Sequence, residues 1–181
     1  MPLVSDLTKY TTTSPIIASF DFEDIASGVK YLTYYPYTDA ATNLILGSFP
    51  TSGFGSKIQT QALGEQNYNT TVFNTRRTVN GTVVIDVAYF DYVEGQPFTF
   101  ILYRVSGGAE TQIGTGTWTS GSGVNSVGTI TFQATRTVIN KGDHLRLDMT
   151  ITGSISGKIY IDPTDTLGRG VTKLYVPFEV K

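Results

Sequence analysis

His144 is the only histidine in the 181 residues, so any chemistry that moves a proton through imidazole depends on it. A serine hydrolase would pair it with a serine nucleophile and with a carboxylate such as Asp143 or Asp148. The sequence contains no Gly-x-Ser-x-Gly elbow, because Gly153–Gly157 places Ile155 at the nucleophile position and no helical pattern follows. We therefore predict that His144 lies at the edge of a turn, outside any catalytic triad.

The sequence also offers few residues that could bind a metal ion or a cofactor. One histidine and no cysteine exclude the ordinary zinc sites and leave only calcium binding by oxygen ligands. Asp143, Asp162 and Asp165 could supply such oxygens, but their spacing is not that of an EF-hand. Asp162 precedes Pro163, a pair that is typical of a turn. The sequence predicts no metal and no cofactor.

A pair of carboxylates suits glycoside hydrolysis, and Asp21 and Glu23 share one face at the spacing of a strand. The simpler interpretation is that they form the solvated side of that strand. With 15 acidic residues some pair always has a suitable spacing. We therefore expect that the protein is not an enzyme, and a hydrolase on this scaffold is the weakest of three hypotheses.

Tyrosines gather at Tyr31, Tyr34, Tyr35 and Tyr37, and a phenol ring with a polar tip suits both sugars and protein interfaces. Tyr31 and Tyr35 lie on one side of the expected strand and Tyr34 on the other, so they cannot form one sugar platform. A glycan would instead stack on an exposed tyrosine or on Trp118. The residues that we predict to contact partner proteins are Tyr34, Tyr37, Phe54 and Tyr92.

Composition restricts the partners further. The net charge is −2 and the isoelectric point is near 5.3, which argues against nucleic acid, since phosphate recognition needs a basic stripe. No apolar run approaches the roughly 18 residues of a membrane span. Charged residues are 15% of the chain, where about a quarter is usual. A threonine-rich surface that is poor in charge suits β-strands, and it also suits a protein whose faces are covered by partners.

Period-two alternation recurs along the chain, and no stretch has a convincing helical period. Glycine, proline, asparagine and aspartate separate the alternating runs; Gly107-Gly108 predicts a hairpin, and Asn140–Asp143 predicts a turn. The expected strands are residues 16–23, 29–35, 44–49, 57–61, 68–74, 82–90, 98–105, 111–119, 127–138, 144–152, 158–162 and 173–180. This pattern predicts an all-β, antiparallel jelly-roll-type sandwich, with residues 1–15 as an N-terminal arm and residues 16–181 as one domain.

Four short segments carry a family resemblance: Arg77–Thr82, Lys141–Leu147, Ile159–Pro163 and Leu174–Val180. They resemble jelly-roll structural proteins of viruses of microbes, bacteriophages included. The resemblance implies a virion protein of the capsid decoration, turret or minor capsid type. Its expected partners are other virion proteins, the major capsid protein first, and copies of itself in a homo-oligomer. The alternative is a carbohydrate-binding or receptor-binding module, with a glycan as the partner.

Overall fold

The computed structural model describes residues 28–38, 43–48, 58–60, 64–91, 97–119, 123–151, 158–161 and 171–180. Within these ranges the chain is built of strands and contains no helix, and so no helix that could cross a membrane. The strands are β1 (Val29–Thr38), β2 (Leu44–Gly47), β3 (Ile58–Thr60), β4 (Gly64–Asn69), β5 (Arg77–Asp91), β6 (Pro97–Ser106), β7 (Ala109–Thr119), β8 (Gly123–Ile139), β9 (His144–Ile151), β10 (Lys158–Tyr160) and β11 (Lys173–Glu179).

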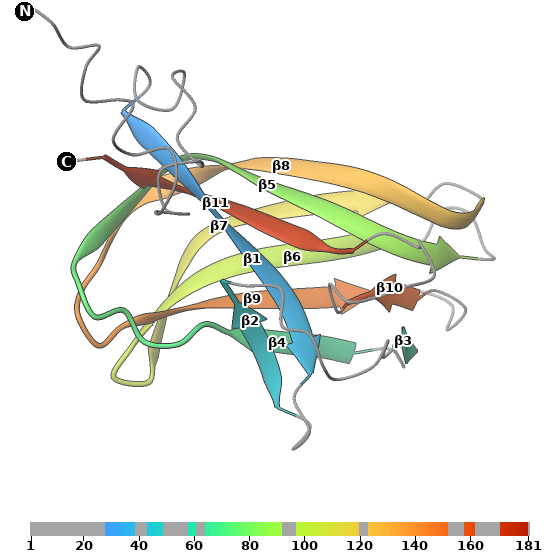
Figure 1. Cartoon of the computed structure of the whole chain (residues 1–181), viewed down its shortest axis with the longest axis horizontal. Coiled ribbons are helices and arrows are strands. Elements are labelled where there is room, and N and C mark those ends of the chain that lie inside the picture. The colour runs from blue at the N-terminus through green and yellow to red at the C-terminus, as the bar shows by residue number, and fades with distance from the viewer. Residues whose placement is uncertain are drawn as a thin grey trace, which may run out of the picture.

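The strands form two facing layers (Figure 1). One layer has the order β8-β5-β11-β1, with β10 and β3 added beside the end of β5. The other has the order β4-β9-β6-β7, with β2 beside β4. Strand β1 joins the layers, because its first half pairs with β11 and its second half with β2. Among the described strands, the first and the last are neighbours and the chain crosses repeatedly between the layers, which is a jelly-roll arrangement and confirms the predicted fold class. The pairing of β2 with β4 is parallel and departs from the expected antiparallel pattern.

Alternation decides which face each strand buries. In β9, Leu145, Leu147 and Met149 are fully buried, while Arg146 between them points out of the sandwich. In β5, Val83, Ile85 and Val87 form the matching inward row. Each side chain of this size stabilises the fold by about 1.5–3 kcal/mol when it is taken out of water. The two inward rows face each other and make the core.

Two predicted turns are confirmed, and side chains explain the second. Gly107 and Gly108 both have positive φ, 56° and 86°, as the two-residue hairpin between β6 and β7 requires. In the turn between β8 and β9, the carboxylate of Asp143 accepts the N–H of Asn140 at 2.8 Å and an N–H of Arg104 at 2.7 Å. Asp143 is therefore a turn residue that is tied to β6.

The predicted strand at residues 68–74 is shifted in the structure, where β4 is Gly64–Asn69. The chain leaves the ladder at Thr70, whose hydroxyl accepts the N–H of Leu145 at 3.0 Å. Beyond it, Phe73 exchanges backbone hydrogen bonds with the β8–β9 turn, accepting from Gly142 and donating to Asp143. The predicted strand at residues 16–23, and the boundary between arm and domain after residue 15, lie outside the described residues.

Candidate functional site

The outer face of the layer β4-β9-β6-β7 carries a row of side chains that runs across five strands. On one side of the row, the strand register places Tyr37 of β1 opposite Ile45 of β2, and Ile45 beside Asn69 of β4. On the other side, Asn69 lies opposite Arg146 of β9, and Arg146 lies opposite Tyr103 of β6. Residues in register share a face. We call Tyr37, Ile45, Asn69, Arg146 and Tyr103 the contact row.

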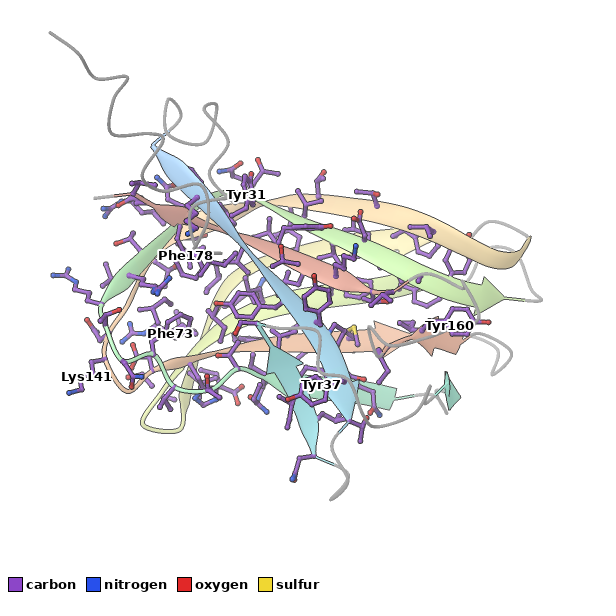
Figure 2. All side chains as sticks on the ribbon, viewed as in Figure 1. Tyr31, Tyr37, Phe73, Lys141, Tyr160 and Phe178 are labelled. Carbon is purple, nitrogen blue, oxygen red and sulfur yellow. The ribbon has the colours of Figure 1, made fainter. Side chains whose placement is uncertain are left out.

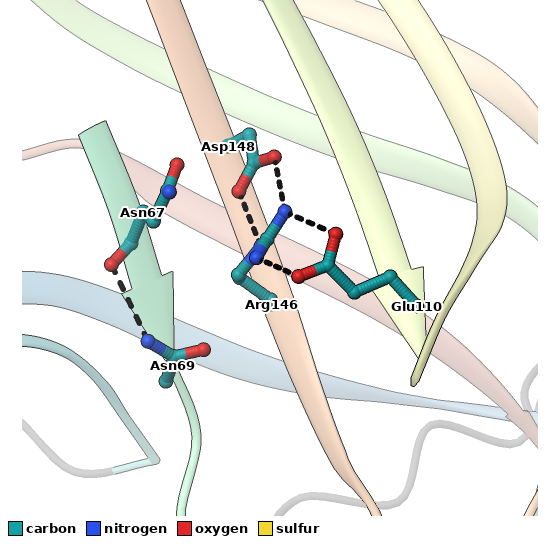
Figure 3. Close-up of polar contacts among 5 residues, drawn as sticks. All are labelled: Asn67, Asn69, Glu110, Arg146 and Asp148. Atoms are coloured by element: carbon teal, nitrogen blue, oxygen red, sulfur yellow. Dashed lines mark hydrogen bonds and ion pairs between the residues drawn. The ribbon is translucent and has the colours of Figure 1, made fainter. Parts of the chain in front are cut away.

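Arg146 is the centre of this row, and two carboxylates hold its guanidinium (Figure 3). Its two terminal nitrogens bond to Glu110 of β7, Nη1 to Oε1 and Nη2 to Oε2, the latter at 2.9 Å. On the other side, Nη2 donates to Asp148 Oδ2 at 2.9 Å, and Nε lies 2.7 Å from Asp148 Oδ1. The ring of Tyr103 lies 5.0 Å from the guanidinium carbon, a cation–π distance. Arg146 is thereby fixed in one orientation.

Asp148 is an unusual carboxyl group for a sheet face, since it is only 3% exposed. Its burial raises its pKa; Arg146 opposes this shift, and the nearby Glu65 adds to it. Burial also opposes the charge on Arg146, but its hydrogen bonds to Asp148 and Glu110 outweigh that effect and raise the pKa of the guanidinium. The group of Glu65, Glu110, Asp148 and Arg146 thus carries three acids and one base, and it favours a positively charged or hydrogen-bond-donating neighbour.

The amides on β4 leave part of this face available for further hydrogen bonds. Asn69 donates a 3.5 Å bond to the carbonyl of Asn67 (Figure 3), while the buried side-chain oxygen of Asn67 has no hydrogen-bond partner among the described residues. Those residues contain no group of three histidines, cysteines or acids that could hold a metal ion. This face is equipped for polar and aromatic contact.

The predicted partner-contact residues fall in different places. Tyr37 lies in the contact row, half-buried near the lower end of β1 (Figure 2). Tyr34 points the other way into the core with 5% exposure, and burial raises its pKa to about 12 against the opposing effect of Arg77. Its ring has no surface to offer a partner, so we remove Tyr34 from the predicted contacts. Phe54 and Tyr92 lie outside the described residues.

The possible triad partners of His144 are engaged elsewhere. His144 begins β9 opposite Val105 of β6, at the edge of the turn as predicted. Asp143 is held by Arg104 and the backbone of Asn140, and Asp148 by Arg146. Alternation marks Arg146 and Asp148 as outward residues of β9, but their importance depends on Tyr103 and Glu110, which only the strand order brings to them.

Lowering the pH is expected to change the contributions of the two buried aspartates, Asp143 and Asp148, to stability in opposite directions. The pKa of Asp143 is lowered because, although burial opposes it, the bonds from Ser106, Asn140 and Arg104 prevail. Relative to Asp143→Asn, the wild-type protein should therefore lose stability as pH falls below about 3.8. The pKa of Asp148 is raised, so relative to Asp148→Asn the wild-type protein should gain stability as pH falls through that raised pKa toward 3.8. Urea unfolding between pH 6 and about 3 measures both differences, and slopes of equal sign would contradict the assignment.

No protein-family model and no curated protein matches the sequence. Among solved structures, a CocE/NonD family hydrolase from Staphylococcus aureus superposes with a TM-score of 0.60 at 11% identity, over 83% of this chain and 37% of that chain. An aminopeptidase from a marine sediment Thaumarchaeota archaeon superposes with a TM-score of 0.51 at 8% identity, over 63% of this chain and 25% of that chain. This chain thus spans well under half the length of either protein. At such identities the likeness shows a shared fold.

These matches correct our expectation that the protein is not an enzyme. The fold is one that a hydrolase and an aminopeptidase contain, so the lack of a familiar catalytic motif does not exclude an enzymatic context. A structure of infectious bursal disease virus, Gx strain, superposes over 83% of this chain and 36% of that chain, at 14% identity and with a TM-score of only 0.28. That score is too low to argue from. The virion location, the decoration role and the homo-oligomer therefore stay predictions.

Proposed function

We propose that this chain is a jelly-roll contact domain that works by packing the contact row against another protein. The observation that carries the proposal is the composition of the row, which brings two tyrosines, an arginine, an isoleucine and an asparagine together from five strands. Tyrosine and arginine dominate the energetic centres of protein interfaces. Arg146 is already fixed by Glu110 and Asp148, so binding would order few further side chains.

The first candidate setting is a virion, where the chain would be a capsid decoration, turret or minor capsid component bound to the major capsid protein and to its own copies. The sequence resemblance at Arg77–Thr82, Lys141–Leu147, Ile159–Pro163 and Leu174–Val180 supports it. The strand order supports it as well, because jelly rolls are common in viral capsids. Closed symmetry would let a weak contact through one face be repeated into a stable assembly.

The second candidate setting is a hydrolase, in which this domain would pack beside a hydrolytic domain. The TM-score of 0.60 to a CocE/NonD family hydrolase supports it, together with the share of only 37% of that chain which the match covers. Mass spectrometry of purified virus particles and hydrolysis of a chromogenic ester by the full protein separate the two settings. Presence in the particle supports the first and ester hydrolysis the second, whereas a glycan array that binds the chain would support the receptor-binding alternative.

Self-association is the direct test of the contact row. We expect Tyr37→Ala and Tyr103→Ala each to weaken self-association about 30-fold, the effect of losing roughly 2 kcal/mol at an interface centre. Light scattering at micromolar concentration measures it. Tyr31→Ala is the matched control, because Tyr31 lies on the same strand but outside the row, with its hydroxyl bonded to the carbonyl of Thr82. A wild-type protein that is strictly monomeric and captures no partner would rule out the proposal.

A further inference from the structure

Three cations gather at one end of the sandwich without a carboxylate partner among the described residues. Arg76, Arg77 and Lys141 are all exposed, and we call them the basic end. Their basic neighbours differ in this respect, since Arg104 pairs with Asp143 at 2.7 Å and Arg136 with Glu179 at 2.7 Å. Among the described residues, no carboxylate therefore compensates the positive charge of the basic end.

Backbone contacts hold this end together. Arg77 begins β5 opposite Ile139, the last residue of β8, and Phe73 exchanges hydrogen bonds with the turn that follows Lys141. The guanidinium of Arg77 lies 5.9 Å from the ring of Phe73 and 5.7 Å from the ring of Phe178. Figure 2 shows Phe73, Phe178 and Lys141 at this end of the molecule. The rings position Arg77, and no carboxylate in the described ranges pairs with its guanidinium.

Acidic residues outnumber basic ones in the part of the sequence that the structure does not describe. The described residues contain nine lysines and arginines against seven acids, whereas the whole chain contains 13 against 15. The described part is thus positive and the remainder negative. Three of the remaining acids, Asp21, Glu23 and Asp24, fall within four consecutive positions shortly before β1.

The entry to β1 lies at the same end of the sandwich. The N–H of Val180 donates to the carbonyl of Gly28, and Val180 follows Phe178, which pairs with Val79 of β5. The register therefore places Val180, which directly follows β11, between Gly28, which directly precedes β1, and Arg77, at the start of β5. At the usual strand spacing, Gly28 and Arg77 are about 10 Å apart. Asp24 precedes Gly28 by four residues, which span at most roughly 14 Å.

We propose that the acidic segment Asp21–Asp24 docks on the basic end of its own chain. Three carboxylates then meet three cations, and Phe22 brings an apolar group toward Val72, which is 55% exposed beside Phe73. The short tether gives the segment a high effective concentration at this surface. A nucleic acid is a poor occupant, because three cations on a chain of net charge −2 release few counterions.

A nitroxide label tests this docking cleanly, because the natural chain has no cysteine. Ser19→Cys carries the label and keeps all three acids. In low salt we expect the backbone amide NMR signals of residues 72–77 and 140–142 to broaden. At 1 M salt, where the screening length is about 3 Å, we expect the broadening to weaken in the same sample to the level that an undocked tether produces. Broadening that does not change with salt, or none at low salt, overturns the proposal.

Charge variants and a mixed sample identify which side chains dock and on which copy of the chain. Asp21→Asn with Glu23→Gln and Asp24→Asn should abolish the salt-dependent part of the broadening, and so should Arg76→Gln with Lys141→Gln. Lys173→Gln, a basic residue of β11 that pairs in register with Asp86, should leave the broadening intact. Broadening of isotope-labelled chains by separate nitroxide-labelled chains would show docking on a second copy and would overturn the intramolecular form. The salt titration uses the unaltered charges, so it decides the matter even if a charge variant fails to fold.

Discussion

Replacing Arg146 by alanine is expected to destabilise the fold by about 2 kcal/mol, measured by urea unfolding at pH 7. The substitution leaves Asp148, 3% exposed, as a buried carboxylate without its cation, and leaves Glu110 without its bidentate partner. The expected loss is below the 3–5 kcal/mol of a fully buried pair, because the side chain of Arg146 keeps 16% exposure. Acid should reduce the loss, since protonation removes the charge that Arg146 had balanced.

Arg136→Ala is the matched control for this prediction. Arg136 also makes a bidentate pair, with Glu179, but its side chain is 60% exposed. Exposed pairs contribute little because water and salt already screen them, so this variant should unfold near the wild-type midpoint. Equal losses from the two alanine variants would show that burial of Asp148 is not the source of the effect.

The sequence predicted where the strands lie along the chain better than it predicted which strands pair with each other. Period-two rows such as Leu145, Leu147 and Met149 mark the buried face of a strand whatever lies beside it. The pair Gly107-Gly108 and the run Asn140–Asp143 indicated turns for local reasons, and both predictions are confirmed. The pairing of β1 with β11, by contrast, depends on packing between residues about 150 positions apart. No local pattern encodes that choice.

The contact row also depends partly on local sequence patterns and partly on strand pairing, which those patterns do not encode. Alternation on the expected strands 98–105 and 144–152 turns Tyr103 and Arg146 away from the buried rows, whereas Tyr37 lies outside the expected strand 29–35 and Asn69 lies on a strand whose bounds are shifted. The row itself depends on β2 lying beside β4 and on β9 lying between β4 and β6. Tyr34 and Tyr37 illustrate the limit, because both are tyrosines of one strand and an odd spacing puts them on opposite faces. Composition favoured both as partner contacts, whereas only strand register separates the core residue from the surface one.

Trp118 shows why a single aromatic residue is an ambiguous signal in a sequence. Our sugar-binding alternative used it as an exposed stacking platform. In the structure its ring lies 4.6 Å from Tyr89 and 5.2 Å from Phe98, edge-on and tilted, and it packs against the core. It also covers the backbone of β8 at Gly128, where an added Cβ would lie 2.5 Å from Trp118 Cζ2. Gly128 is therefore the residue that allows the indole to lie flat on this strand.

Gly128→Ala is accordingly expected to destabilise the protein by about 2 kcal/mol, because the indole is held by two rings and cannot withdraw without strain. Since the chain has one tryptophan, its fluorescence reports on this site alone, and the emission should shift to longer wavelength as the ring moves into water. Trp118→Leu in the alanine background should recover part of the loss by removing the clash. Thr131→Ala, at an exposed position on the same strand, should change neither stability nor emission. Unchanged emission in Gly128→Ala would mean that the indole does not lie on Gly128, and the sugar-stacking role of Trp118 would then have to be considered again.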